Sequence, residues 1–184
     1  MLGYTGFEVA AAWRFQEAES RHFDRVLAAG HPTIEAEREA ASFKPPIEVL
    51  PVMMGDPIGR VEIPRLGLSA MVVEGVGRSS LRRAVGHIPG TALPGEHGNT
   101  AISAHRDTYF RPLRNIQHND MITLTTVGGR YDYRVVSMKI VSPKEVGVLD
   151  PSGTQTLTLI TCYPFYFVGA APNRFIVRAE RVTW

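Results

Sequence analysis

The sequence predicts a mainly β protein, a closed barrel of about eight strands with short helices, preceded by an N-terminal helical segment. Short runs of β-branched and apolar residues recur from residue 59 onward, and several of them alternate with polar residues as half-buried strands do. Glycine and proline separate these runs as turn signals. In the first part of the chain, apolar residues instead recur at helical spacing.

Composition excludes several classes of protein. The chain has 184 residues, of which 44% are hydrophobic and 21% charged, which is typical of one globular domain and not of disordered or fibrous chains. A net charge of +2, spread along the chain, does not indicate a nucleic-acid partner. No run approaches the roughly 20 apolar residues that cross a bilayer, and no signal peptide begins the chain.

Residues 1–44 are predicted to form a helical segment that precedes the domain. Residues 9–29 lack proline and have amphipathic spacing, and Gly30-His31-Pro32 ends this helix. A second short helix is predicted over Thr33–Phe43. The segment has five basic and seven acidic residues, whereas the rest has fifteen and eleven, which supports a boundary. The segment is either a spacer packed loosely on the domain or a regulatory lid over whatever site the domain carries.

Residues 45–58 are predicted as a proline-rich linker, and the β-barrel domain is predicted over 59–184. Alternation and flanking turn residues predict strands at residues 59–64, 68–73, 99–104, 121–127, 131–141, 156–162 and 174–182. Short helices are predicted at 79–85, 109–116 and 143–148, the first capped by Ser79 or Ser80. Glycine and proline mark 86–98 as a loop, and 163–172 is a second loop.

The predicted strand over 156–162 ends in Cys162, the only cysteine of the chain, so an internal disulfide is excluded. Alternation places Cys162 on the same face as Thr158 and Ile160, whereas Leu159 and Thr161 point to the other face. A strand end beside a loop would anchor the thiol and leave room for a substrate. The alternative is that Cys162 is a small buried apolar residue.

Two further strand ends carry groups that assist a thiol in acyl transfer. His105 follows the strand over 99–104, and Arg174 opens the last strand. A nearby imidazolium or guanidinium stabilises the thiolate, and histidine exchanges protons near neutral pH. Arginine can hydrogen-bond an oxyanion with its rigid fork of donors. Taken singly, a strand-end histidine or arginine is more often a surface residue.

Taken together, these residues resemble the sortase family of cysteine transpeptidases. Thr158-Leu159-Ile160-Thr161-Cys162 fits the Thr-Leu-x-Thr-Cys signature of the family, and His105 and Arg174 fit its histidine and arginine. Tyr163-Pro164 after the cysteine is similar to the class D and class E branches. The resemblance covers roughly residues 59–184. One departure is Ala104, where the family usually has glycine.

The resemblance implies an eight-stranded sortase-type barrel that cleaves a Leu-Pro-x-Thr-Gly-like sorting signal between Thr and Gly. Cys162 would hold the acyl group, and an amine acceptor would take it, which attaches secreted proteins to the cell surface. It also implies an extracytoplasmic location, with a membrane anchor absent from this chain, and no cofactor. We expect Thr161, Tyr163, Asp107 and Arg111 to contact the substrate, although Asp107 and Arg111 could instead form surface salt bridges.

Other readings remain open. A cysteine hydrolase would use the same three residues with water as acceptor, and a non-catalytic barrel binding module would have an inert thiol. An L,D-transpeptidase would need a Ser-x-Gly-Cys segment, which is absent. His97 is the alternative base. We expect no metal site, because His87, His97, His105 and His118 lack the tight spacing of zinc ligands.

Overall fold

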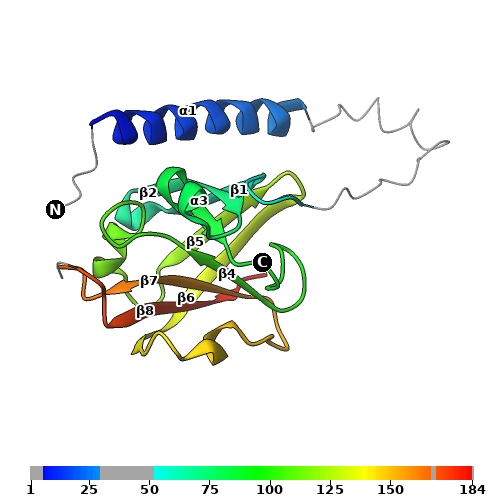
Figure 1. Ribbon diagram of the computed structural model, residues 1–184. Helices are drawn as coiled ribbons and strands as arrows, with labels where there is room; N and C mark the ends of the chain where they lie inside the picture. Colours follow the sequence, from blue (N-terminus) through cyan, green and yellow to red (C-terminus); the bar gives the residue numbers. More distant parts are fainter. Residues whose placement is uncertain (1–5, 30–51, 167–168, 184) are drawn as a thin grey trace.

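A computed structural model describes residues 6–29, 52–166 and 169–183 of the chain. The helix α1 lies along one side of a barrel of strands (Figure 1). In chain order the elements are α1 (Gly6–Ala29), β1 (Pro57–Ile63), η2 (Pro64–Leu66), β2 (Leu68–Glu74), α3 (Arg78–Arg83), β3 (Val85–His87), β4 (Asn99–Ser103), η3 (Arg111–Asn115), β5 (Met121–Thr126), β6 (Gly129–Val141), η4 (Val146–Leu149), β7 (Thr156–Tyr163) and β8 (Asn173–Arg181).

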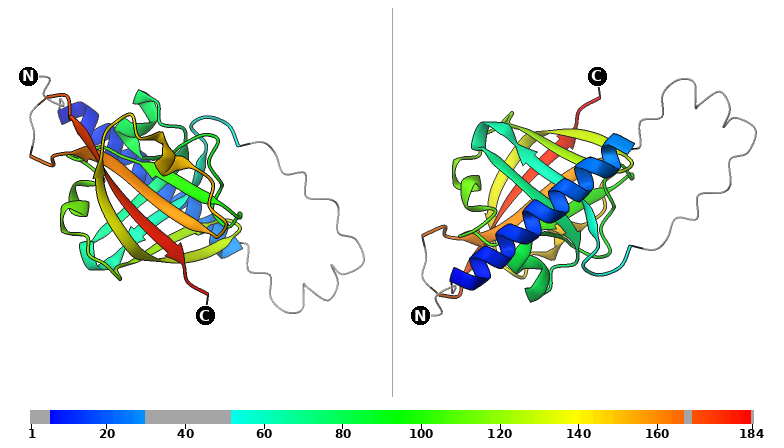
Figure 2. Two further views of the ribbon diagram at one scale, coloured as in Figure 1. Left: turned by 90° about the horizontal axis from the view of Figure 1, so that it is seen from below. Right: turned by 90° about the horizontal axis from the view of Figure 1, so that it is seen from above.

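The strands form a closed barrel in the order β1-β2-β3-β4-β7-β8-β6-β5, and β5 pairs with β1 to close it. Most neighbours are antiparallel, but the pairs β2–β3 and β4–β7 are parallel. Strand β7 therefore lies between β4 and β8, which come from distant parts of the sequence (Figure 2). The prediction of a mainly β, closed, eight-stranded barrel with short helices is confirmed.

The barrel interior is filled by the apolar side chains that alternate along each strand. Ile102 of β4, Leu159 of β7 and Val177 of β8 are fully buried there. The connection from β4 to β5 adds Phe110 and Leu113 to the same core. Full burial of one such side chain contributes about 1.5–3 kcal/mol, so this packing fixes the three central strands relative to one another.

The eighth strand corrects the sequence prediction, which made residues 86–98 a loop. Residues 86 and 87, the first two of this predicted loop, belong to β3, which pairs in parallel with β2 and antiparallel with β4. A Cβ at Gly86 would overlap the carbonyl oxygen of Gly75, so this close approach of two backbones requires glycine. The His87 side chain is 2% exposed, and its Nδ1 lies 2.7 Å from Glu74 Oε2. A three-residue strand shows too little alternation to be predicted.

The other predicted elements are present with bounds that differ by a residue or two at most strand ends. Helix α3 begins after Gly77, and neither Ser79 nor Ser80 caps it, which corrects that prediction. The two later helices are shorter than predicted and are 3-10 turns. Strand β1 starts at Pro57, inside the predicted linker. The second helix, over Thr33–Phe43, lies outside the described residues.

Helix α1 is attached to the barrel through Gln16, whose amide bonds with two backbone groups. Its Oε1 accepts a hydrogen bond from the Met71 N–H of β2 at 2.8 Å, and its Nε2 donates to the Arg83 carbonyl at 2.6 Å. The Arg83 guanidinium also lies 4.6 Å from the centre of the Phe15 ring. Within the described residues, no helix is long and apolar enough to span a bilayer.

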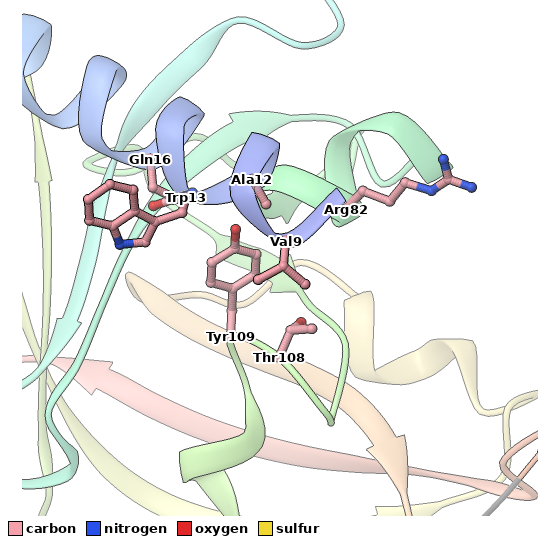
Figure 3. Close-up of a pocket in the computed structure, with 7 residues that line it drawn as sticks. All are labelled: Val9, Ala12, Trp13, Gln16, Arg82, Thr108 and Tyr109. Carbon is pink, nitrogen blue, oxygen red and sulfur yellow. The ribbon is translucent and has the colours of Figure 1, made fainter. Parts of the chain in front are cut away.

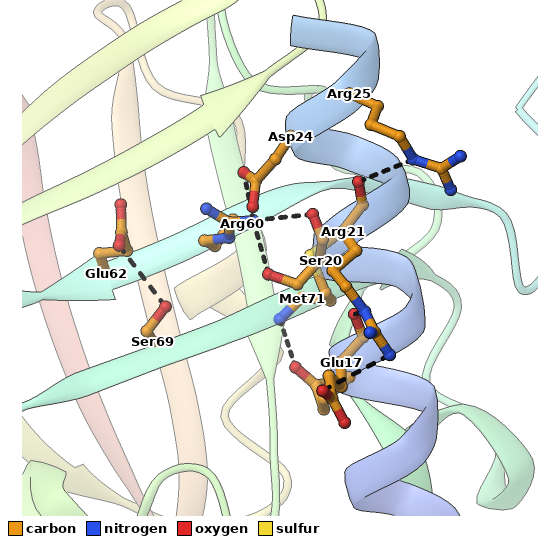
Figure 4. Close-up of polar contacts among 10 residues, drawn as sticks. Glu17, Ser20, Arg21, Asp24, Arg25, Arg60, Glu62, Ser69 and Met71 are labelled. Atoms are coloured by element: carbon orange, nitrogen blue, oxygen red, sulfur yellow. Dashed lines mark hydrogen bonds and ion pairs between the residues drawn. The ribbon is translucent and has the colours of Figure 1, made fainter. Parts of the chain in front are cut away.

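A second attachment of α1 is centred on Arg60 of β1 (Figure 4). The Arg60 guanidinium donates to Ser20 Oγ at 2.6 Å and to Asp24 Oδ1 at 2.8 Å. It also lies 5.5 Å from the centre of the Phe23 ring, and Phe23 is 6% exposed. The barrel thus holds α1 through polar and cation–π contacts between Phe15 and Asp24, nearly three turns of the helix.

Candidate active site

Cys162 of β7, Arg174 of β8 and His105, two residues past the end of β4, belong to neighbouring segments of the barrel and are called the row below. In the β7–β8 ladder Cys162 is directly opposite Arg174. In the parallel β4–β7 ladder Ser103 pairs with Ile160, and the Ala104 N–H donates to the Ile160 carbonyl at 3.3 Å. Continued by two residues beyond the end of β4, this register would bring His105 beside Cys162. Directly opposite residues of an antiparallel pair have Cβ atoms about 4.5–5.5 Å apart.

The row is on the outer face of the barrel. Leu159 of β7 and Val177 of β8 point into the core, and their neighbours in the chain point outward by alternation. Cys162, His105 and Arg174 are all half-buried, so a solvent-borne substrate can reach groups that the ladder still holds in place. Strand pairing thus brings Cys162 and Arg174 together, and the Ala104–Ile160 hydrogen bond ties the residue before His105 to β7. The catalytic roles of the three residues stay a prediction.

Thr161 lies on the face opposite Cys162 and is 2% exposed. Its hydroxyl donates a hydrogen bond to the Ala104 carbonyl at 2.8 Å. This bond joins β7 to the chain just before His105, beside the row. The observed contact of Thr161 is therefore structural, and a contact with substrate stays a prediction.

The Arg174 guanidinium is held by the loop that precedes it. Its Nη1 donates to the Asn173 carbonyl at 3.0 Å and to the Ala171 carbonyl at 3.3 Å. Its Nε and Nη2 have no partner in the parts of the chain that the structure describes. The fork is thus fixed by one nitrogen and has donors left for a charged or polar group of a substrate.

The remaining predicted substrate contacts are at the edges of the row. The Tyr163 ring packs against Phe175 and Phe165, with centroid distances of 6.3 and 6.0 Å. Asp107 and Arg111 are exposed, and neither forms a salt bridge with any residue in the described ranges. The salt bridges considered as an alternative are therefore not seen there. Substrate contact by these three residues stays a prediction.

The segment that carries His105 is fixed by backbone and side-chain bonds. The Phe110 N–H donates to the His105 carbonyl at 3.2 Å, and the Phe110 side chain is fully buried. Further along, the Arg65 guanidinium donates to the Asn115 carbonyl at 2.6 Å and forms a bidentate ion pair with Asp120. This hydrogen-bonded guanidinium lowers the pKa of the Asp120 carboxyl below its ordinary value. The segment is thus anchored near both of its ends.

Three other histidines, His87, His97 and His118, belong to the described part of the barrel domain. His97 is exposed in the loop before β4, and His118 is exposed before β5. His87 is buried, with its Nε2 3.1 Å from the Ala92 carbonyl oxygen. Among the described residues, no three histidine, cysteine, aspartate or glutamate side chains form a group that could hold a metal ion.

A cavity of about 270 Å³ lies between α1 and the segment after His105. Figure 3 shows Val9 and Trp13 of α1 beside Thr108 and Tyr109. The Tyr109 hydroxyl donates to the Arg83 carbonyl at 2.7 Å, the same oxygen that Gln16 binds. The lining residues include none of the row, so this cavity is separate from the candidate site.

The family model of the sortase domain matches residues 61–182, which include the whole row. The chain belongs to the sortase family. It is 35% identical to sortase D of Bacillus subtilis over 192 aligned positions, which cover 100% of this chain and 92% of that protein. This similarity agrees with the predicted class D resemblance.

Solved structures show the same fold. A sortase D5 transpeptidase of Clostridium perfringens aligns with a TM-score of 0.72 at 24% identity, covering 95% of this chain and 99% of that one. A sortase C from Clostridium perfringens aligns with a TM-score of 0.67 at 25% identity, covering 99% and 93%. The protein is a sortase-type cysteine transpeptidase. Sortases act on peptide sorting signals and in general work outside the cell or at its membrane.

Proposed function

We propose that this sortase cleaves a Leu-Pro-x-Thr-Gly-like signal between Thr and Gly, holds the acyl group on Cys162 and transfers it to an amine. The observation that supports the proposal is the pairing of Cys162 with Arg174 in the β7–β8 ladder, with His105 two residues past the end of β4, the other neighbour of β7. In the proposed site the Cys162 nucleophile would have the His105 proton-transfer group on one side and the Arg174 cation on the other. Acyl transfer through a thioester needs both.

The chemical steps follow from the row. The Cys162 thiolate, stabilised beside the His105 imidazolium, attacks the threonine carbonyl carbon and forms a C–S bond. The carbonyl oxygen becomes negative, and the unpartnered Nε and Nη2 donors of Arg174 stabilise it. His105 gives its proton to the departing glycine amine as the C–N bond breaks, which leaves a thioester. An incoming amine then attacks the thioester carbonyl, His105 takes its proton, and the thiolate leaves.

The partners follow from this chemistry and from the family. The first is the sorting signal of a secreted protein, and the second is an amine on the cell wall or another surface molecule. Membership of the sortase family supports an extracytoplasmic site of action and a membrane anchor that is not among the described residues. The exposed side chains of Asp107 and Arg111, close in sequence to His105, are candidates for contact with the signal peptide.

The test is to trap the acyl-enzyme. The purified protein is incubated with sorting peptides and weighed by mass spectrometry, with and without an added amine such as triglycine. We expect a mass increase equal to the acyl fragment, which requires Cys162, and an amide product with the amine. A product that is the free acid at every amine concentration would favour the hydrolase. A thiol reagent that reacts no faster with Cys162 than with a free peptide thiol would favour the binding module.

A further inference from the structure

Arg106, the residue after His105, connects the two segments that flank the row. Its Nη1 donates to the Pro164 carbonyl at 2.9 Å, and its Nη2 donates to the Gly169 carbonyl at 3.0 Å. Both acceptors belong to the described parts of the β7–β8 loop, which are residues 164–166 and 169–172. The Arg106 side chain is half-buried, so these bonds are partly shielded from water.

The two carbonyls are at different places in the loop. Pro164 is the second residue after Cys162, and Gly169 is five residues before Arg174. A planar guanidinium that binds both of them fixes one stretch of backbone relative to the other, because its N–H groups have a fixed geometry. Arg174 meanwhile binds the Ala171 carbonyl from the other end of the loop. The arginine after His105 and the arginine opposite Cys162 thus hold the same loop.

A weaker contact supports this arrangement. The Arg114 Nη1 donates to the Tyr166 hydroxyl at 3.0 Å, so the β4–β5 connection binds the loop a second time. Tyr166 is 79% exposed, and a hydrogen bond at that exposure contributes little. Arg106 is therefore the principal attachment of the loop to the segment that carries His105.

We propose that Arg106 is a positioning residue, which holds the β7–β8 loop in the arrangement that accepts the sorting signal. This proposal rests on the proposed function. Arg106 does not contact the reacting atoms in the proposed steps; it acts through the loop. When a binding-competent arrangement is populated only in part, the apparent affinity falls by that fraction, while the bound complex still reacts at its normal rate. Loss of Arg106 should therefore raise KM and leave kcat nearly unchanged.

The experiment compares Arg106→Met with the parent protein, because methionine keeps much of the apolar stem and removes the donors. We expect KM for a sorting peptide to rise about three- to tenfold and kcat to stay within about twofold. Arg106→Lys should give an intermediate KM, since an ammonium group lacks the planar fork. Arg134→Met is the matched control, because Arg134 is an exposed arginine of β6, and it should leave both constants unchanged.

A second readout measures the loop directly. Chymotrypsin cleaves after aromatic residues, and the loop presents Phe165 and Tyr166. Under native conditions the cleavage rate follows the population of the open loop, so Arg106→Met should be cut there about three- to tenfold faster than the parent and the Arg134→Met control.

Three results would overturn the proposal. One is a fall in kcat at constant KM, which would place Arg106 in the chemical step. Another is a KM change with no faster cleavage of the loop than in Arg134→Met, which would show that the effect on KM does not act through the loop. The third is no change in either readout. If the parent protein itself forms no acyl-enzyme, the proposed function fails, while the chymotrypsin comparison still tests whether Arg106 holds the loop.

Discussion

The row and the attachment of α1 are built in different ways. Backbone ladders place Cys162 opposite Arg174, and the side chains of the row take no part in holding β7 to its neighbours. Helix α1 is instead held by side chains, among them Gln16 and the group around Arg60. The backbone position of each residue in the row is thus set by strand pairing and does not depend on its side chain. The attachment of α1 to the barrel does depend on particular side chains. Substitutions in the row should change chemistry at constant stability, and changes in α1 should do the opposite.

The largest expected effect is that of Cys162→Ala. The chain has no other cysteine, so this variant should form no acyl-enzyme and cleave no peptide. Its fold should remain, because β7 keeps its ladder and the half-buried side chain contributes little packing. Mass spectrometry and thermal unfolding measure the two properties. Peptide cleavage by the purified, folded variant would contradict the cysteine mechanism.

The His105→Asn substitution should cause the second largest loss of activity. Asparagine keeps some hydrogen bonding but does not titrate, so turnover should fall by about a hundred- to ten-thousandfold, the usual contribution of general acid–base catalysis. The pH–rate profile should also become flat. Steady-state rates across the neutral pH range check both points, with thermal unfolding as the control for stability. An unchanged rate and profile would point to His97 as the base.

Arg174→Lys should have a somewhat smaller effect. Lysine keeps the charge but loses the planar fork, so turnover should fall by about a hundred- to a thousandfold, as when an oxyanion donor is removed. The pH optimum should stay where it is in the parent, in contrast to His105→Asn. Arg134→Lys is the matched control. If the Arg174→Lys variant is nearly as active as the parent, the assigned role of Arg174 is excluded.

Removal of residues before Pro46 should have the smallest effect on the reaction. We propose that this segment is a spacer, and that the chain from Pro46 folds and keeps its rate on a soluble peptide within about twofold. Its stability should fall, because the Met71 N–H exchanges its bond to Gln16 for one to water and a typical hydrogen bond contributes about 0.5–1.5 kcal/mol. Denaturant unfolding and peptide turnover measure the two. A large rise in turnover would support the lid, and loss of folding would show that α1 belongs to the domain.

The difference between placement by strand pairing and attachment by side chains also explains what could be predicted from the sequence. Alternation along residues 156–162 indicated the face of Cys162, and the strand ends indicated His105 and Arg174, because those features are local. The contacts of α1 and of Arg106 could not be predicted, since they depend on which distant carbonyl lies within reach of a side chain. For Arg106 the one available signal was its place directly after His105.

Strand β3 and the start of α3 were missed for related reasons. β3 exists because two backbones approach closely at Gly86, and a glycine in a glycine-rich stretch carries no sign of that approach. At α3 the serines suggested a side-chain cap, but the helix begins at Gly77 without one. In both places tertiary contacts outweighed the local preference.

The position of β7 between two sequence-distant strands has a consequence for folding. His105 and Arg174 come near Cys162 only after both ladders of β7 have formed, and pairings between distant segments form slowly because of the loop entropy that they cost. In an unfolded or half-assembled chain, Cys162 is an ordinary thiol with ordinary nucleophilicity. The reactivity of this one thiol is therefore a probe of barrel closure. During refolding, its rate of alkylation should change when β7 pairs with both of its neighbouring strands.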